Sequence, residues 1–168
     1  MNNYIKILGT IKGVADALFP EALFLSATWD QMSQESYGVT DKIVIGLNQG
    51  FIITQGSITD STSSATVIID FGLPDQYDDN STQQFNVIAS AEVVAGQFLE
   101  ALNSVQIDSG LAIGQFRIVP YYKKWGLTLS GVAIELNLVV GQGCETFPSI
   151  EDYIEYIGRN ISPSNWGV

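Results

Sequence analysis

The chain is 168 residues long, the size of one ordinary domain, and 46% of its residues are hydrophobic, which is enough to build a core. It carries 18 Asp and Glu against 7 Lys and Arg, for a formal net charge of −11. This acidic balance argues against a groove that tracks nucleic-acid phosphates and against binding to an anionic membrane. There is no histidine, and Cys144 is the one cysteine. The commonest general base, the commonest metal ligand and an internal disulfide are therefore excluded.

Charged residues make up 15% of the chain, below the roughly 25% of typical soluble domains. Its surface must therefore consist largely of Ser, Thr, Asn, Gln and Gly, which suits a subunit packed against copies of itself or against other subunits. The alternative is an ordinary monomer with a neutral polar surface. The first residues do not resemble a signal peptide, and no apolar run approaches the ~20 residues of a membrane span. We therefore expect a product of the cytoplasm.

A first helix is predicted over residues 3–19, because apolar residues recur there at steps of three and four. The stripe consists of Tyr4, Ile7, Leu8, Ile11, Val14 and Leu18. Gly9 and Gly13 fall inside it, and they either admit another backbone closely or simply weaken the helix. Phe19-Pro20 ends the helix, since the residue before a proline is displaced from helical geometry.

Alternating and short apolar runs then predict a series of strands. These cover residues 22–34, 42–47, 51–54 and 66–71. Residues 31–40, which overlap the end of the first range, are polar and are expected to form a loop. The Ser- and Thr-rich stretch Gln55–Thr66 forms either a long hairpin arm or a loop, and Ile58 is one of its two apolar residues. Asp75–Asn80 gathers three carboxylates, but the spacing does not match a helix-loop-helix calcium site. A solvated acidic linker is the favoured interpretation.

A second helix is predicted from Ser81 to about Asn103, with Ser81 and Gln84 at the spacing of a capping box. Its apolar residues are Phe85, Ile88, Ala91, Ala95, Phe98, Leu99 and Leu102. Residues 105–110 then connect it to the sheet.

Two long strands follow, over Leu111–Tyr122 and Leu127–Val140. Even positions of the second strand are apolar from 132 to 140, while Glu135 and Asn137 are polar, as in a strand with one buried face. Pro120 cannot donate to a strand ladder, which places the first strand at or near a sheet edge.

A short third helix is predicted from Ser149 to Gly158, again with the spacing of a capping box, and Gly158 is expected to stop it. Its apolar face consists of Ile150, Tyr153, Ile154 and Ile157. The tail holds Trp166, which we expect to dock either on its own domain or on a neighbour.

Together these elements predict one α+β domain over residues 1–168, with a core of 1–140 and a C-terminal helix and docking tail over 141–168. The sheet is expected to be mostly antiparallel. The two main helices are expected to pack on one of its faces, with a long polar hairpin arm and a short C-terminal helix completing the fold.

Few residues offer chemistry. Without histidine, a nucleophile of the Ser–His or Cys–His kind cannot form, and Gly141-Gln142-Gly143 does not continue into a phosphate-binding loop. Glu135 is the acid best placed for an acid-only glycoside hydrolase, although a solvent-facing strand residue is the simpler interpretation. We expect no catalytic residue, no metal site and no cofactor.

The densest aromatic and basic cluster is Tyr121-Tyr122-Lys123-Lys124-Trp125, between the two long strands. Such residues serve either nucleic-acid binding or protein interfaces. In a chain of charge −11 we favour protein contact, for instance with the acidic surface of a neighbouring copy. The alternative is a hairpin end whose tryptophan covers the edge of the core. The predicted interface residues are Tyr121, Tyr122, Lys123, Lys124, Trp125, Ile58 and Trp166.

The segment Gly126-Leu127-Thr128-Leu129-Ser130-Gly131-Val132-Ala133-Ile134-Glu135-Leu136 is similar to the final strand of bacteriophage neck and tail proteins, where a leucine–small–glycine turn leads into an alternating strand. The order of the predicted elements over residues 1–140 also resembles that of the tail-terminator and tail-completion proteins of long-tailed bacteriophages. Residues 141–168 have no counterpart in this resemblance.

The resemblance implies a small α+β structural protein of the virion, without a catalytic site. It would form a homo-oligomeric ring, expected to be hexameric, at the end of the tail tube or in the head–tail neck. The implied partners are the tail tube and the neck or connector proteins, with no sequence-specific nucleic acid and no membrane. A ring of acidic subunits would surround a channel that repels DNA. The rival hypothesis is a stand-alone protein-binding or virion-decoration module, and the acid-only glycoside hydrolase comes third.

Overall fold

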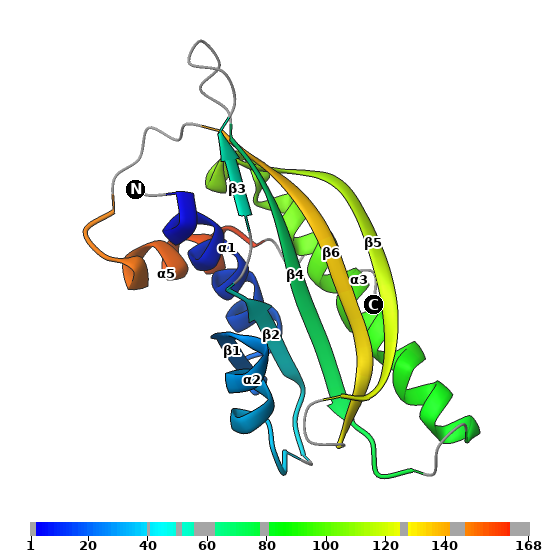
Figure 1. Cartoon of the computed structure of the whole chain (residues 1–168). Coiled ribbons are helices and arrows are strands. Elements are labelled where there is room, and N and C mark those ends of the chain that lie inside the picture. Colours follow the sequence, from blue (N-terminus) through cyan, green and yellow to red (C-terminus); the bar gives the residue numbers. More distant parts are fainter. Residues whose placement is uncertain are drawn as a thin grey trace.

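The computed structural model describes residues 3–39, 41–49, 52–55, 63–77, 81–124, 128–141 and 147–161, and within these ranges the side chains of residues 29, 52–55 and 124 are left out of the description. It has the predicted α+β class (Figure 1). The elements are α1 (Asn3–Leu18), β1 (Leu23–Ala27), α2 (Trp29–Glu35), β2 (Val44–Asn48), β3 (Ile52–Gln55), β4 (Ser63–Pro74), α3 (Thr82–Ser104), α4 (Gln106–Ser109), β5 (Leu111–Lys124), β6 (Leu129–Val140) and α5 (Ile150–Asn160).

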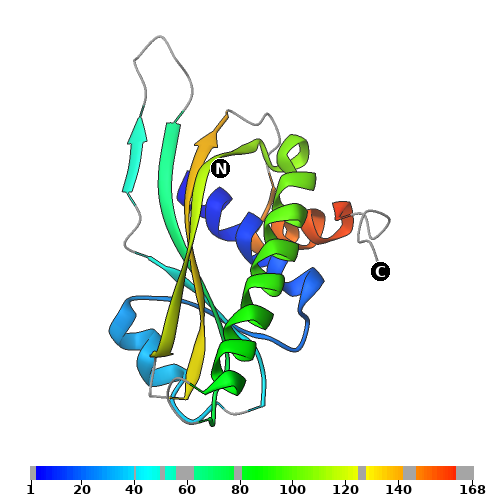
Figure 2. The same ribbon diagram turned by 90° about the vertical axis from the view of Figure 1, so that its right-hand side faces the viewer.

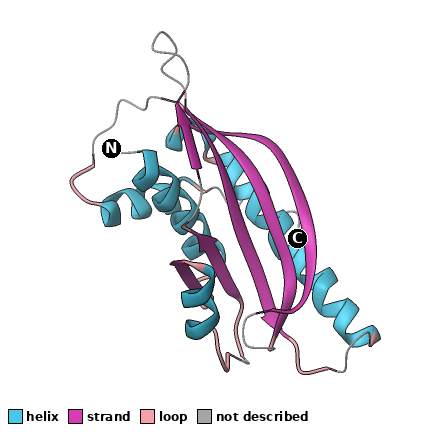
Figure 3. Ribbon diagram, in the orientation of Figure 1, coloured by secondary structure: helices cyan, strands magenta, loops and turns pink. Residues whose placement is uncertain are grey.

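The strands form one mixed sheet with the order β1-β2-β4-β6-β5, and β3 pairs with β4 beside this path. Among the described strands, β1 and β2 are the one parallel pair; the other pairs are antiparallel, as expected. The predicted pair of long strands is confirmed as β5 and β6, and β4 pairs with β6 along its whole length. Figure 3 shows these long strands as the body of the sheet. Pro120 lies on β5, which is an edge strand, as its missing N–H predicted.

The two described ends of the polar stretch Gln55–Thr66 belong to paired antiparallel strands. Gln55 ends β3 and pairs with Ser63, the first residue of β4, and the pairing continues to Ile52 and Thr66. β4 is therefore longer than the strand predicted over 66–71, because its polar first residues pair on both sides, with β3 and with β6. Residues 56–62, including Ile58, lie outside the described part of the chain.

The main core lies on one face of the sheet, beneath α1 and α3. Alternate residues of β4 and β6 point into it, including Ile69, Phe71, Ile134 and Leu136, and all are fully buried. The even positions of β6 are buried from Val132 to Val140, so the predicted buried face of this strand is confirmed. Figure 2 shows α3 on this side of the strands and α2 on the other.

A smaller cluster covers part of the opposite face. Met32 of α2 is fully buried there, packed with Leu25, Val44 and Leu129. The sequence predicted a strand and then a loop over 22–40, and this prediction was wrong for α2. The amide oxygen of Gln31 accepts hydrogen bonds from the backbone N–H of Thr28 (3.2 Å) and from its hydroxyl (3.1 Å). This local contact starts a helix within an alternating pattern that suggested a strand.

The C-terminal helix packs on α1 through the two glycines of α1. A Cβ at Gly9 would lie 2.6 Å from Cδ1 of Tyr153, and a Cβ at Gly13 would lie 2.9 Å from the carbonyl oxygen of Ile154. Close approach, rather than helix weakening, therefore explains both glycines. Gly158 does not stop α5, which runs to Asn160, because Gly158 is itself part of this helix–helix contact.

A buried lysine ties α1 to the end of the sheet. Lys6 is almost fully buried, and its Nζ donates a hydrogen bond to the carbonyl oxygen of Gly141, at 3.0 Å. Burial lowers the pKa of Lys6. Nearby, the hydroxyl groups of Thr10 and Tyr153 are 2.9 Å apart and share a buried hydrogen bond. The sequence pattern gave no sign of either contact.

By length and composition alone, α3 (Thr82–Ser104) is long and apolar enough to cross a membrane, although the sequence analysis expected no such segment. One face of this helix packs on the sheet, with Ile88, Ala91 and Phe98 buried in the main core, while Phe85 and Val93 are exposed. In its most apolar stretch, 39% is buried in the fold.

Candidate functional site

The predicted aromatic and basic cluster lies where β5 ends and β6 begins, next to the N-terminus of α3. The structure does not keep the cluster together, because neighbouring residues of a strand point to opposite faces. Tyr121 lies on the face away from α3, while Tyr122 lies on the α3 face. Lys124 is the last residue of β5 and pairs with Leu129. Trp125, Ile58 and Trp166 lie outside the described residues.

Tyr121 is half-buried, and its hydroxyl group lies in the interior. A Cβ at Gly72 would lie 3.1 Å from the Tyr121 hydroxyl oxygen, so this hydroxyl reaches across β6 to the glycine of β4. Burial, together with the negative charge of the nearby Asp70, raises the pKa of Tyr121 well above its ordinary value. Tyr121 therefore stays a neutral phenol at physiological pH.

Tyr122 is a surface residue. Its ring meets that of Phe85 edge to face, with ring centroids 6.4 Å apart, and the two residues are 51% and 49% exposed. Phe85 was predicted on the buried stripe of the second helix, and this was wrong. Its neighbour Gln84 is buried instead, and it is only 1% exposed.

Gln84 can be buried because Asp75 satisfies its amide. Asp75 is 2% exposed and accepts hydrogen bonds from Nε2 of Gln84 (2.8 Å), from the backbone N–H of Tyr77 (3.1 Å) and from the hydroxyl of Ser130. Asp75 was predicted to lie in a solvated acidic linker, and this prediction is wrong for this residue. Asp78 and Asp79 lie outside the described ranges.

The same contacts set the charge of Asp75. Burial alone would raise its pKa, but the hydrogen bonds from Ser130, Gln84 and Tyr77 and the positive charge of Lys123 outweigh it, so the pKa of Asp75 is lower than its ordinary value. The backbone N–H of Lys123 donates to the Ser130 hydroxyl at 2.8 Å. Asp75 is thus an ionised link between the ends of β4, β5 and β6 and the first turn of α3.

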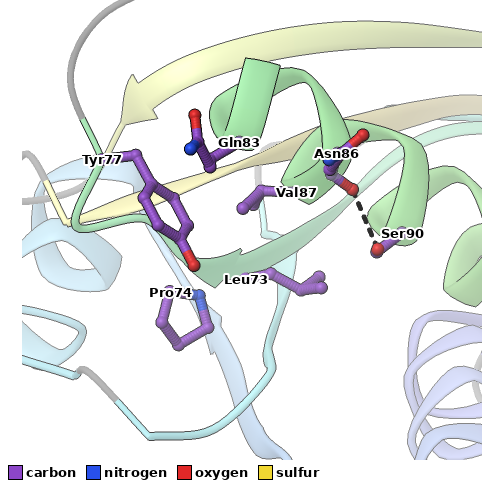
Figure 4. A pocket seen from close by; sticks show the side chains of 7 residues that line it. All are labelled: Leu73, Pro74, Tyr77, Gln83, Asn86, Val87 and Ser90. Carbon is purple, nitrogen blue, oxygen red and sulfur yellow. Dashed lines mark hydrogen bonds between the residues drawn. The ribbon is translucent and has the colours of Figure 1, made fainter. Parts of the chain in front are cut away.

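A shallow hollow of about 320 Å³ lies beside this link, between the end of β4 and the first turns of α3 (Figure 4). It is lined by Leu73, Pro74, Tyr77, Gln83, Asn86, Val87 and Ser90. Figure 4 shows the Tyr77 ring at one end, Leu73 and Pro74 along one wall and the α3 side chains along the other. No local sequence pattern predicted this site, because its walls come from two separate elements, the end of β4 and the first turns of α3.

Glu135 is held by a cation. Nε of Arg117 on β5 donates to Oε2 of Glu135 on β6, at 2.5 Å. The hydrogen bond from Arg117 lowers the pKa of Glu135, which favours the ionised carboxylate over a proton donor. Asp70 is the acid on the same face of neighbouring β4, but it is fully buried. The geometry therefore gives little support to a pair of glycosidase carboxylates. Within the described ranges, no three His, Cys, Asp or Glu residues gather as a possible metal site.

The exposed apolar side chains concentrate on two elements. Of the large hydrophobic residues that are exposed in the described part of the chain, half lie on α3 and β5, namely Phe85, Val93, Phe116, Val119 and Tyr122. Three of the chain's seven cations, Arg117, Lys123 and Lys124, also lie on β5, which has no acidic residue. This edge strand is therefore basic and aromatic in a strongly acidic chain, a combination that is typical of protein interfaces.

No protein-family model matches the chain, and the search of curated proteins finds no match.

Proposed function

We propose that the chain is a structural virion protein, a subunit of a homo-oligomeric ring at the head–tail neck or the tail end of a long-tailed bacteriophage, where it terminates or joins the tail tube. The element order that suggested this role includes the antiparallel pair of β3 and β4, the helix α3 and the long β5–β6 pair. The observation that carries the proposal is the difference in charge between the two edges of the sheet.

The edges differ in both charge and apolar character. β5 forms one edge, with its cations and its exposed Phe116 and Tyr122. β1 forms the other edge, and α2 follows it; Figure 1 places them on opposite sides of the molecule from β5. The segment around β1 and α2 is acidic, with Glu21, Asp30, Glu35 and Asp41 against Lys42.

Complementary edges favour head-to-tail contact between copies. The basic edge of one copy would face the acidic edge of the next, and such heterologous contacts generate rings when the rotation between copies closes. Opposite charges would fix the order and direction of the copies, while apolar side chains such as Phe116 and Tyr122 would supply most of the binding free energy.

A charge-swap experiment tests this arrangement. One variant carries Arg117→Glu and Lys124→Glu on β5, and the other carries Glu35→Lys and Asp41→Lys on the acidic edge. Neither should form a ring alone, because like charges then face each other at every contact. Mixing the two should restore an alternating ring of large mass, because each reversed edge now meets an oppositely charged partner.

Multi-angle light scattering and negative-stain imaging give the readout, with and without purified tail tube. A ring of the unmodified protein that is lost in each variant and restored in the mixture supports the proposal. An unmodified protein that stays an 18.2 kDa monomer, and forms no ring when tail tube is added, overturns it in favour of a stand-alone binding module. Rings that persist in both variants would place the contact elsewhere on the surface.

A further inference from the structure

We propose that the hollow between the end of β4 and the first turns of α3 binds a neutral sugar ring. This inference is independent of the proposed ring assembly, because it concerns residues of β4, the following turn and α3 rather than the edge strand β5. It rests on the size of the hollow, the chemistry of its lining and the way in which its walls are held.

The hollow suits a small ligand rather than a protein surface. Its volume of about 320 Å³ is at the lower end of the range for small-molecule sites. The described residues that bound it are seven, from β4, the following turn and α3. A protein interface needs several hundred Å² on each partner, far more than these residues present.

None of the described residues that line the hollow carries a charge. Its polar groups are the amides of Gln83 and Asn86 and the hydroxyls of Tyr77 and Ser90. Amides and hydroxyls both donate and accept hydrogen bonds, as sugar hydroxyl groups do. An anionic ligand would find no counter-charge among these described residues, so a phosphate or a carboxylate is disfavoured.

The remaining lining is apolar and includes one exposed aromatic ring. Leu73, Pro74 and Val87 give an apolar wall, and the Tyr77 ring is exposed at the end of the hollow (Figure 4). A pyranose has C–H groups on its faces and hydroxyls around its rim. The electron-rich face of an aromatic ring attracts such C–H groups, while the rim can reach the amides on α3.

The walls are set in place before any ligand binds. The backbone N–H of Tyr77 donates to Asp75, which also accepts from Gln84, so the turn and the helix are fixed to the same buried carboxylate. On α3, the Ser90 hydroxyl donates to the carbonyl oxygen of Asn86 at 2.9 Å, which leaves the lone pairs of that hydroxyl free to accept from a ligand. A preformed site of this kind loses little conformational entropy on binding.

The test is an NMR titration of the isotope-labelled full chain with methyl glucoside, methyl galactoside and N-acetylglucosamine. At least one of them should shift the backbone amides of Tyr77, Gln83, Asn86 and Ser90 in a saturable way, with a Kd on the order of millimolar for so small a ligand in an open site. Sorbitol, which has the hydroxyls of a sugar but no ring, should produce much smaller shifts.

Two variants and one control complete the experiment. Tyr77→Ala should weaken binding about tenfold, because it removes the ring but keeps the backbone N–H that bonds Asp75. Asn86→Leu removes one amide at similar size and should also weaken binding. Tyr37→Ala removes another exposed tyrosine, on the turn after α2, and should bind as the unmodified chain does.

Three outcomes would overturn the inference. The first is that none of the three sugars shifts these amides at concentrations well above millimolar. The second is that sorbitol shifts them as strongly as the sugars do. The third is that Tyr77→Ala and Asn86→Leu bind as tightly as Tyr37→Ala. None of these outcomes bears on ring formation, which is measured by mass and imaging, so the two proposals can fail separately.

Discussion

The side-chain amide of Gln84 donates to the carboxylate of Asp75 at 2.8 Å, while the backbone N–H of Gln84 donates to the hydroxyl of Ser81 at 3.2 Å. Gln84 is at the third helical position. In a complete capping box, the side chain at this position would bond to the backbone N–H of the N-cap residue, Ser81. Here its backbone completes the cap, and its side chain joins the helix to the end of β4. One residue thus begins α3 and fixes its position on the sheet.

Removing the carboxylate should destabilise the fold. In Asp75→Ala, the buried donors on Gln84 and Ser130 lose their acceptor, and each unsatisfied buried group costs about 1–3 kcal/mol. We expect the free energy of unfolding to fall by about 2–4 kcal/mol, measured by urea denaturation. Asp41→Ala removes an exposed aspartate as a control and should change it by less than about 0.5 kcal/mol. Equal effects in the two variants would contradict a structural role for Asp75.

The same carboxylate predicts how stability depends on pH. The pKa of Asp75 in the folded chain lies below the ordinary value of 3.8, so the folded state favours the ionised form. Its contribution is fully present above the pKa of the unfolded chain and is lost as the pH falls through the folded pKa. Thermal unfolding followed from neutral pH to below 3.8 should show this loss. In Asp75→Asn the loss over that range should be smaller; an unchanged pH profile would show that other carboxylates cause it.

The helix α3 shows what local sequence could and could not predict. Its N-cap and most of its buried stripe follow from residues within one or two turns, and both were predicted correctly. The burial of Gln84 depends on Asp75, which lies outside the helix, and on Ser130, which the β4–β6 pairing brings to the same place. No local pattern contains that information, so the sequence suggested Phe85 for the buried position instead.

In two other places the sequence did contain the pattern that predicts the observed structure, although the prediction did not use it. Thr28 and Gln31 have the spacing of a capping box, yet the alternating pattern before them favoured a strand over α2. The cluster Tyr121-Tyr122 was treated as one surface, although the two-residue period of a strand requires its members to face opposite sides. By contrast, the contact of Tyr121 with Gly72 required the register of three strands, β4, β6 and β5, and could not be foreseen.

We expect opposite effects on stability from two Gly→Ala substitutions, one in α1 and one in α3. Gly13→Ala adds a Cβ that would lie 2.9 Å from the Ile154 carbonyl oxygen and 3.0 Å from Cβ of Ile157, so α5 must shift. We expect a net loss of about 1–3 kcal/mol in the free energy of unfolding. Gly96→Ala, within α3, meets no atom within 4 Å and should gain about 0.5–1 kcal/mol from helix propensity. Chemical denaturation of both variants tests the pair, and a gain in Gly13→Ala would mean that α5 is not packed on α1 as described.

The exposed face of β5 predicts a variant that changes assembly and leaves the fold intact. Phe116 is 52% exposed on this edge strand, so Phe116→Thr removes an apolar contact from the proposed interface and keeps a residue that favours strands. We expect self-association to weaken at least about tenfold, with the free energy of unfolding changed by less than about 1 kcal/mol.

Val139→Thr makes a similar exchange at an exposed position of β6, one strand inward, and should leave assembly unchanged. Sedimentation velocity across a range of concentrations measures the first effect and urea denaturation the second. If Val139→Thr weakens assembly and Phe116→Thr does not, the copies meet through the open face of the sheet rather than through its basic edge.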